Sequence, residues 1–242
     1  MSDTDPIELM IVGDEWPPMQ ALASSLTALG PVVAHAANEP ELPDVLSAYD
    51  VVIMYIHKVM DTRVEQALIR YAKQGGRLIV LHHGLASAKI QNPNFLALAG
   101  LHIEPSDAPR HAWRVAGHVT HTLVNLHPSH YITSHRVQYD RSVHYQPSEG
   151  LSCSDLFPAL DFYDTEVFLN QQVTDGREKT ILFGVMCGDP VSGETIMQDR
   201  GGWYKRADEG WFFYLQPGHT AEEFRNPAYV QIIMNCITWR PE

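Results

Sequence analysis

The N-terminal part of the chain alternates between short apolar runs and segments with helical periodicity. The apolar runs lie at 7–13, 32–36, 49–56 and 77–83. The run at 49–56 is continuous and β-branched, which is typical of a strand buried on both faces of a parallel sheet. We therefore predict four strands in this part, separated by helices.

Two helices are predicted among these strands. Residues 17–30 start with a pair of prolines and end at a glycine. Residues 61–76 are amphipathic; Thr62 and Glu65 have the spacing of a capping box, and a Gly-Gly pair ends the segment. Parallel strands that are joined through helices form a right-handed, doubly wound sheet. The pattern thus predicts an α/β fold with a flavodoxin-like, mostly parallel sheet.

The pattern changes after residue 100. Eight of the 13 histidines lie within residues 102–144, among short strand-like pieces and Pro-containing turns. We expect residues 102–175 to be an inserted or edge β-rich segment of a single domain that spans residues 1–242. An edge strand or this segment could also support a symmetric homodimer.

A last helix is predicted near the C-terminus. Residues 227–239 carry an apolar face, and Asn226–Pro227 is a helix start signal. Just before it, Thr220 and Glu223 have the spacing of a second capping box.

Composition and charge narrow the choice of partners and location. The chain has 242 residues, of which 45% are apolar, and a net charge of −12 without a basic stripe, which argues against nucleic acid or an anionic membrane as partner. Cys153, Cys187 and Cys236 lie far apart and outside any C-x-x-C spacing, so neither a disulfide framework nor a structural zinc site is expected. The chain shows no signal segment and no apolar run of membrane-spanning length, so we expect a cytoplasmic protein.

Three histidines fall at or just after the ends of apolar strands. His57 follows DVVIMYI, His82 follows RLIVL, and His219 lies just past GWFFYLQPG. The carboxyl ends of the strands of an open α/β sheet line the ligand crevice, so these side chains are expected to share one site. The alternative is that they are three unrelated core or surface histidines.

The segment around His82 has the shape of a nucleophile elbow. A helix stopped by glycines, a buried strand and a sharp turn into a small residue follow one another in GGRLIVLHHG. Class I glutamine amidotransferases, which this segment resembles in layout, carry a cysteine at the elbow. An imidazole cannot form their thioester, and none of the three cysteines lies at such a turn. We therefore expect the protein not to be a glutamine amidotransferase.

Several segments together resemble the ThuA-like (trehalose utilisation) family. They are YDVVIMYIH, GGRLIVLHHG, LHPSHYIT, DTEVFLN and GWFFYLQPGHTAEEFRNPAYVQIIMNCITW, in that order. The resemblance spans nearly the whole chain, from about residue 7 to residue 240. The resemblance implies a class I glutamine amidotransferase-like, flavodoxin-type fold. It also implies a role in bacterial disaccharide catabolism, at the level of 3-keto-sugar derivatives.

The resemblance also implies site residues. His82 matches the family's L-H-x-G turn, His219 its G-H element, and Glu166 the second acidic position of its D-E-x-Y element. Thr165 replaces the first acidic residue of that element and Phe168 replaces its aromatic hydroxyl. Only Glu166 is therefore carried over from this element.

Histidines and a carboxylate together suit a divalent metal ion. His57, His82, His219 and Glu166 form a nitrogen and oxygen donor set that favours Zn²⁺ and tolerates Mn²⁺ or Fe²⁺. A metal with an open position could polarise a sugar carbonyl or activate water. Without a metal, His82, His219 and Glu166 could act as general acid and base instead.

Four residues are candidates for substrate contact. Asp14 follows the first strand at the crevice, although it could equally be a turn residue or helix cap. His57 lies at the same edge. Trp203 and Tyr204 follow a Gly-Gly pair in a predicted loop, where they could stack on a sugar ring, whereas the aromatic residues of 211–214 are expected to pack in the core.

The remaining histidines have simpler interpretations. His83 is expected to pack in the turn rather than to bind a ligand. His118 and His121 are three apart, so in a strand they point to opposite sides, and we expect surface positions for both. His127 precedes a proline and is expected to mark a turn.

The sequence thus predicts a protein that acts on, or binds, a sugar or keto-sugar. The favoured hypothesis is an enzyme with metal-assisted hydrolase- or isomerase-type chemistry. The alternative is a non-catalytic sugar-binding protein that delivers or senses a catabolite.

Overall fold

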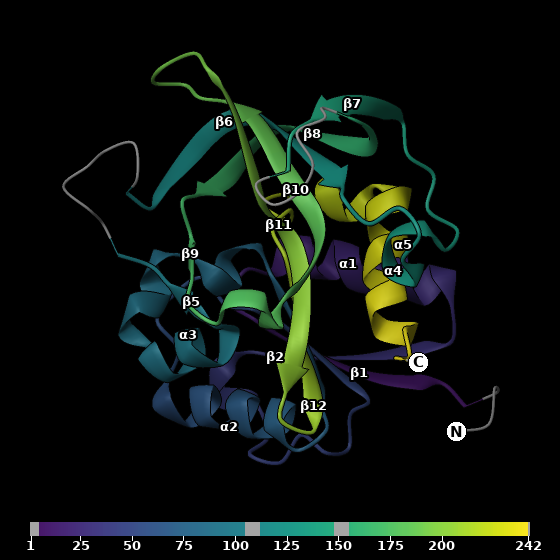
Figure 1. The fold of residues 1–242 in the computed structure, drawn as a ribbon. Helices are drawn as coiled ribbons and strands as arrows, with labels where there is room; N and C mark the ends of the chain where they lie inside the picture. The colour runs from purple at the N-terminus through teal and green to yellow at the C-terminus, as the bar shows by residue number, and fades with distance from the viewer. Residues whose placement is uncertain (1–4, 105–111, 148–154, 242) are drawn as a thin grey trace.

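The computed structural model describes residues 5–104, 112–147 and 155–241, and its centre is one large sheet (Figure 1). The strand order is β2-β1-β3-β4-β12-β11-β10-β6-β8-β7. In chain order these strands are β1 (Ile7–Gly13), β2 (Val32–Ala37), β3 (Val51–Tyr55), β4 (Arg77–Leu81), β6 (Arg114–Asn125), β7 (Arg141–Tyr145), β8 (Asp155–Leu169), β10 (Thr180–Gly188), β11 (Thr195–Ala207) and β12 (Gly210–Leu215).

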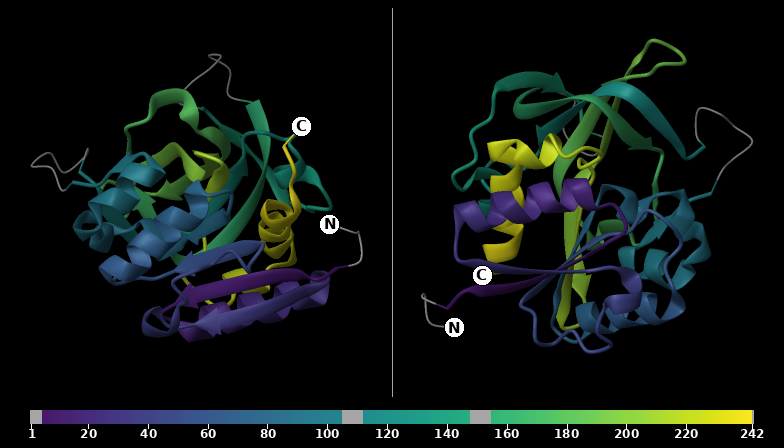
Figure 2. Two further views of the ribbon diagram at one scale, coloured as in Figure 1. Left: turned by 90° about the horizontal axis from the view of Figure 1, so that it is seen from below. Right: turned by 180° about the vertical axis from the view of Figure 1, so that it is seen from behind.

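The first half of the sheet is parallel and covered by helices on both faces. Strands β2, β1, β3, β4 and β12 pair in parallel. One face packs against α1 (Trp16–Leu29) and α5 (Pro227–Thr238), and the other against α2 (Thr62–Lys73) and α3 (Pro93–Ala99) (Figure 2). All five residues of β3 and of β4 are buried, as strands covered on both faces require. The expected flavodoxin-like, doubly wound architecture is confirmed.

The second half of the sheet is antiparallel. Strands β6, β7 and β8 come from residues 102–175, and β10 and β11 join them to β12. A separate two-stranded sheet pairs β5 (Leu101–His102) with β9 (Gln172–Val173). The β-rich segment therefore extends the main sheet, and its two ends meet at the β5–β9 pair.

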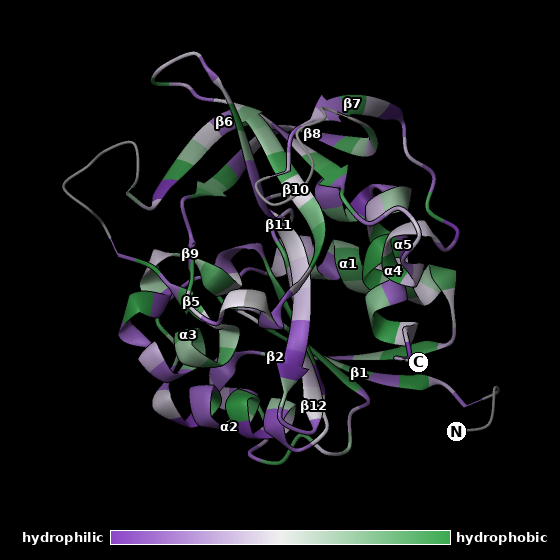
Figure 3. Cartoon of the chain, in the orientation of Figure 1, coloured by the Kyte–Doolittle hydropathy of each residue, from purple (hydrophilic) through white to green (hydrophobic). Residues whose placement is uncertain are grey.

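The alternation of apolar and polar residues follows these layers. Figure 3 shows that the helices that cover the parallel strands contain both hydrophobic and hydrophilic residues. The hydrophobic residues of these helices that are buried pack against the sheet. Two large clusters of buried side chains result, one on each face of the sheet. Among the described residues, no helix is both long and apolar enough to cross a membrane.

The capping box predicted at Thr62 is wrong. Asp61 is the N-cap of α2, and its side chain accepts a hydrogen bond from the Arg63 N–H at 2.8 Å. Glu65 is buried, and its carboxylate accepts from the Phe95 N–H at 2.9 Å instead of reaching back to the cap. Glu65 therefore holds the start of α3 rather than the start of its own helix.

The loop predicted around Trp203 and Tyr204 is also wrong. Both residues lie in β11 and are buried in the clusters on opposite faces of the sheet. Trp203 stacks on Phe212 with ring centroids 5.6 Å apart, and Tyr204 packs against Trp239 at 4.7 Å. Both side chains are part of the core, so they are not in position to stack on a sugar.

Candidate functional site

Four side chains converge at the carboxyl ends of the parallel strands. His82 and His83 follow β4, His219 follows β12, and Glu166 lies in β8. The Oε2 atom of Glu166 is 3.8 Å from His82 Nε2, 3.7 Å from His83 Nε2 and 3.6 Å from His219 Nδ1. One ligand-type atom from each of the four lies within 4.8 Å of the others. We call these four residues the histidine–glutamate centre.

The spacing of the centre fits a metal ion. Tetrahedral Zn²⁺ with bonds of about 2.0–2.2 Å separates its ligand atoms by about 3.3–3.6 Å. The separations from Glu166 Oε2, 3.6, 3.7 and 3.8 Å, lie at or slightly above the upper end of this range, so a metal ion would require small side-chain movements. Three imidazoles and one carboxylate are also a donor set that Zn²⁺ favours and that Mn²⁺ or Fe²⁺ accepts.

The turn at His82 has the shape expected of an elbow. The φ angle of His82 is 42°, in the left-handed region that non-glycine residues seldom adopt. Two residues later, a Cβ atom on Gly84 would lie 2.3 Å from Val80 Cγ1, so only glycine fits there. β4 therefore ends in a tight turn with His82 at its tip.

One hydrogen bond sets the orientation of the His82 ring. Its Nδ1 lies 2.7 Å from the carbonyl oxygen of Gln216, which can only accept, so Nδ1 carries the proton. Nε2 is buried, has no hydrogen-bond partner, and faces Glu166. A neutral His82 therefore points a lone pair toward a carboxylate, which is unfavourable unless a cation lies between the two groups.

Burial favours the neutral form of two histidines of the centre, His82 and His83. It lowers the pKa of His82 and lowers the pKa of His83 to about 4. Contacts with these two rings hold the pKa of the Glu166 carboxyl far below its usual range. Neutral imidazoles and an ionised carboxylate are the forms that bind metal ions.

Gln216 connects the two halves of the fold at the centre. Its side-chain Oε1 accepts from the Phe168 N–H at 3.1 Å, and its Nε2 donates to the Phe168 carbonyl at 3.2 Å. The Phe168 ring in turn stacks on His82 with centroids 4.6 Å apart. This tie holds β8, and Glu166 with it, at the ends of β4 and β12, although β8 is distant in the strand order.

Glu223 fixes the loop that carries His219. It is buried, and it accepts hydrogen bonds from the Gly218 N–H at 2.6 Å and the Thr220 N–H at 3.2 Å, on either side of His219. The Thr165 hydroxyl, next to Glu166, donates to the same carboxylate at 2.6 Å. The bond from the Thr220 N–H is half of the predicted capping box. Through its three hydrogen bonds, Glu223 holds the residues next to His219 and next to Glu166.

His57 lies beside the centre and contacts Glu15 and His83 instead of Glu166. Its Nδ1 is 3.0 Å from Glu15 Oε1, and its ring stacks on His83 with centroids 4.1 Å apart. Glu15 Oε2 is also 3.7 Å from His83 Nδ1. The structure thus brings His57 next to the predicted site, in a second group with Glu15 and His83.

Asp14 supports the turn after β3. Its carboxylate accepts from the N–H groups of His57 at 2.8 Å and Lys58 at 3.1 Å. From the other side, the buried Lys89 ammonium donates to the carbonyls of Ile56, His57 and Lys58. Asp14 therefore acts as the turn residue that the sequence allowed, and His57 is held from both sides.

Sequence reasoning missed two contributors, His83 and Glu15. His83 was expected only to pack in the turn, yet its Nε2 faces Glu166 as closely as that of His82 does. Glu15 follows Asp14 at the end of β1. Both residues come shortly after a buried strand, and this position could have indicated that they belong to the site.

The other histidines lie outside the centre. His118 is 93% exposed and pairs with Asp164, as a surface position predicts. His121 is fully buried, so its predicted surface position is wrong; its ring lies against Phe162 because β6 turns this residue toward the core. His127 lies in a turn, where its carbonyl accepts from the Thr133 hydroxyl. His111 and Cys153 lie outside the described residues.

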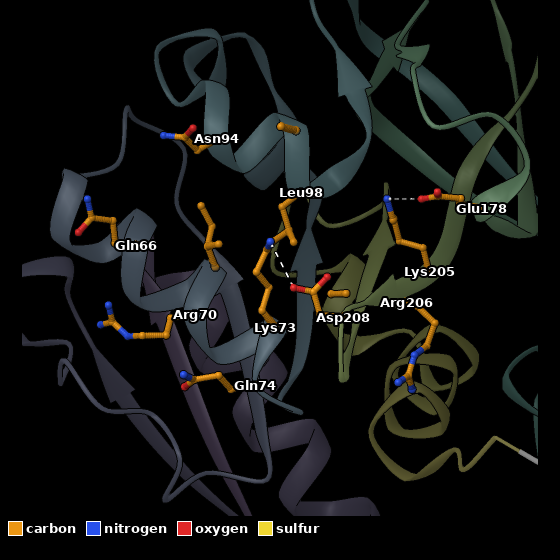
Figure 4. Close-up of a pocket in the computed structure, with 13 residues that line it drawn as sticks. Gln66, Arg70, Lys73, Gln74, Asn94, Leu98, Glu178, Lys205, Arg206 and Asp208 are labelled. Atoms are coloured by element: carbon orange, nitrogen blue, oxygen red, sulfur yellow. Dashed lines mark ion pairs between the residues drawn. The ribbon is translucent and has the colours of Figure 1, made fainter.

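A surface cavity of about 790 Å³ lies at the other end of the strands (Figure 4). It is bordered by α2, α3 and the end of β11, and it contains none of the four residues of the centre. Two of its cations are paired, Lys73 with Asp208 at 3.3 Å and Lys205 with Glu178 at 3.2 Å. This cavity therefore adds nothing to the candidate site.

Comparisons with known proteins agree with the fold. No family model and no curated protein matches the sequence. A solved ThuA-like protein from Bacteroides uniformis is similar in structure over 99% of this chain and 93% of its own, with a TM-score of 0.65 and 15% identity. A cold-adapted β-galactosidase from Rahnella sp. R3 matches over 96% of this chain and 31% of its own, with a TM-score of 0.58 and 10% identity.

A third solved structure is also similar over most of this chain. It is a GMP synthase protein from Thermoplasma acidophilum, which matches over 96% of this chain and 92% of its own, with a TM-score of 0.50 and 12% identity. At these low sequence identities, the comparisons show a similarity of fold only. The chain has a ThuA-like, glutamine amidotransferase-like fold, as its sequence motifs predicted.

Proposed function

We propose that this protein is a metal-dependent enzyme that acts on a sugar or keto-sugar at the histidine–glutamate centre. One observation carries the proposal: buried imidazole nitrogens surround the Glu166 carboxylate at ligand spacing, and His82 Nε2 among them has no other partner. A structural role alone leaves that contact between a lone pair and a carboxylate unexplained.

The residues of the centre have different roles in this proposal. His82 and His83 offer neutral nitrogens, and the Gln216 carbonyl holds the His82 ring in the tautomer that leaves Nε2 free. His219 and Glu166 are partly exposed, so they can reach both the ion and a substrate. Glu166 can bind the ion or, if it remains outside the shell, take a proton from the substrate or from water. A bound divalent metal supplies Lewis-acid polarisation of a carbonyl or activation of a water molecule.

The substrate class rests on the sequence motifs and on the structural neighbours. The motifs resemble the ThuA-like family, and one neighbour is a β-galactosidase. Both concern carbohydrates, and a keto-sugar has the carbonyl group on which a Lewis acid acts. The alternative is a non-catalytic sugar-binding protein, for which the exposed edge of the centre would hold the sugar without reaction.

The decisive experiment combines metal content with turnover. Purified protein should contain bound Zn²⁺, Mn²⁺ or Fe²⁺, and it should convert keto-disaccharides in a reaction that a chelator stops and the metal restores. His82→Ala and His219→Ala should abolish turnover, whereas His118→Ala, a histidine variant outside the centre, should retain it. Sugar binding that survives chelation, without conversion of any keto-disaccharide, favours the binding protein instead.

A further inference from the structure

His83 presents an unused nitrogen on the far side of its ring. Its Nε2 belongs to the histidine–glutamate centre, whereas its Nδ1 lies 3.7 Å from Glu15 Oε2. That distance is too long for a hydrogen bond, and Nδ1 is buried without a partner. The residue itself is only 4% exposed. A buried nitrogen without a bond needs an explanation, because leaving it unpaired is costly.

Glu15 and His57 complete a group around this nitrogen. His57 Nδ1 lies 3.0 Å from Glu15 Oε1, and the rings of His57 and His83 are stacked with an interplanar angle of 14°. The ligand atoms of the three residues lie within 4.8 Å of one another. The side chain of His57 is 54% exposed and that of Glu15 38%, so water can fill the remaining coordination positions.

The comparison between His82 and His83 shows why a hydrogen-bond role does not suffice. His82 Nδ1 donates to a carbonyl at 2.7 Å, which is the usual arrangement of an imidazole that binds one metal ion. His83 has no such acceptor within bonding distance, and each of its nitrogens faces a different carboxylate. A neutral imidazole has only one N–H, so it cannot donate to both.

We propose that Glu15, His57 and His83 Nδ1 form a second site for a divalent cation, and that the His83 ring bridges the two sites through its opposite nitrogens. The inference rests on the metal binding proposed for the histidine–glutamate centre. When both sites fill, the single N–H bond of the ring breaks, a nitrogen–metal bond forms, and the proton passes to water. Two imidazoles and one carboxylate make Zn²⁺ the preferred ion.

The test is a count of bound zinc. Metal-free protein is titrated with Zn²⁺ alone, and the zinc retained is measured by elemental analysis. The wild-type chain should retain about two ions, and His57→Ala and Glu15→Gln about one each, since each removes a ligand of the second site only. His219→Ala should also retain about one, and His57→Ala combined with His219→Ala about none.

His118→Ala is the matched control. His118 is an exposed histidine that lies 2.8 Å from Asp164, much as His57 lies beside Glu15, but the described structure places no third ligand there. This variant should retain as much zinc as the wild type. Both His57 and Glu15 are partly exposed, so their variants should fold, and circular dichroism verifies this.

The contrary results are distinct. If the wild type and His57→Ala retain the same single ion, the second site is wrong and the centre stands. If the wild type retains one ion and Glu15→Gln retains the same ion about 10–100-fold more weakly, Glu15 only orients His83, and the bridge is overturned. If the wild type retains no zinc, the second site is refuted; if it also retains no Mn²⁺ or Fe²⁺, the proposed function is refuted with it.

Discussion

The carbonyl oxygen of Gln216 lies 2.7 Å from His82 Nδ1, and this contact determines which nitrogen of His82 faces Glu166. A main-chain carbonyl cannot be removed by substitution and cannot accept a proton at ordinary pH. The position of the main chain after β12 therefore determines the tautomer of His82. The orientation of the His82 ring thus depends on the main chain as well as on the side chains around it.

Zinc should stabilise the folded protein through the centre. A ligand that binds only the folded state raises the melting temperature by mass action. We expect added Zn²⁺ at neutral pH to raise the melting temperature of His57→Ala, which lacks the proposed second site, and His57→Ala combined with His82→Ala to lose most of this increase. Glu166→Gln should lose less if the carboxylate is a base rather than a ligand. Differential scanning calorimetry with and without zinc measures the effect; an increase that survives in the double variant places the ion elsewhere.

Replacing Glu223 should loosen the loop that carries His219. Glu223→Gln exchanges one acceptor oxygen for an amide donor, which cannot accept from the Gly218 or Thr220 N–H. Loss of such a buried bond should lower the free energy of unfolding by about 1–3 kcal/mol. Glu222→Gln is the control, because the Glu222 side chain is 81% exposed. Urea denaturation of both variants gives the comparison, and equal stability would show that the buried bonds contribute little.

His121 should make the protein sensitive to acid. Burial lowers its pKa from 6.5 to about 3, so between these values the unfolded state binds a proton that the folded state does not. The contribution of His121 is therefore complete above about pH 6.5 and decreases as the pH falls, by up to about 1.4 kcal/mol per pH unit. His121→Leu should flatten the loss of stability between about pH 6 and 4. Denaturation measured across this range tests it; an unchanged slope would show that His121 is accessible to protons in the folded state.

Lys89 should be needed for the turn that presents His57. Its ammonium is buried and donates to the carbonyls of Ile56 at 2.9 Å and Lys58 at 2.6 Å. Lys89→Met keeps the apolar stem but leaves these acceptors unpaired, which should cost on the order of 1–3 kcal/mol of unfolding free energy. Lys73→Met removes an exposed lysine that pairs only at the surface and should cost much less. Thermal denaturation of the two variants provides the measurement.

The parallel half of the fold was predictable because its signals are local. Apolar runs such as 49–56 are continuous only where both faces of a strand are covered, and the histidines at their ends then lie at one edge of the sheet. The position of Glu166 was not predictable from periodicity. It lies in an antiparallel strand that reaches the centre through the Gln216 tie, and only the family resemblance pointed to it.

Two errors have clear physical reasons. His83 was expected only to pack in the turn, but the backbone at His82 is left-handed, and both His82 and His83 face Glu166. The glycines before Trp203 were interpreted as a loop signal. In the structure they allow close packing within the sheet, since a Cβ atom on Gly201 would lie 2.5 Å from the Gly184 carbonyl oxygen.

The side chain of Gln216 binds both the N–H and the carbonyl of Phe168, as a neighbouring strand would. The Phe168 amide proton is thus shielded by a contact between the two halves of the sheet. Its rate of exchange with deuterium should report how often those halves separate at this edge, without unfolding of the whole chain. In Gln216→Leu the amide of Phe168 should exchange faster while amides in the middle of β4 keep their protection. The exchange rate of the Phe168 amide would then measure how often Glu166 and His82 separate in the folded protein.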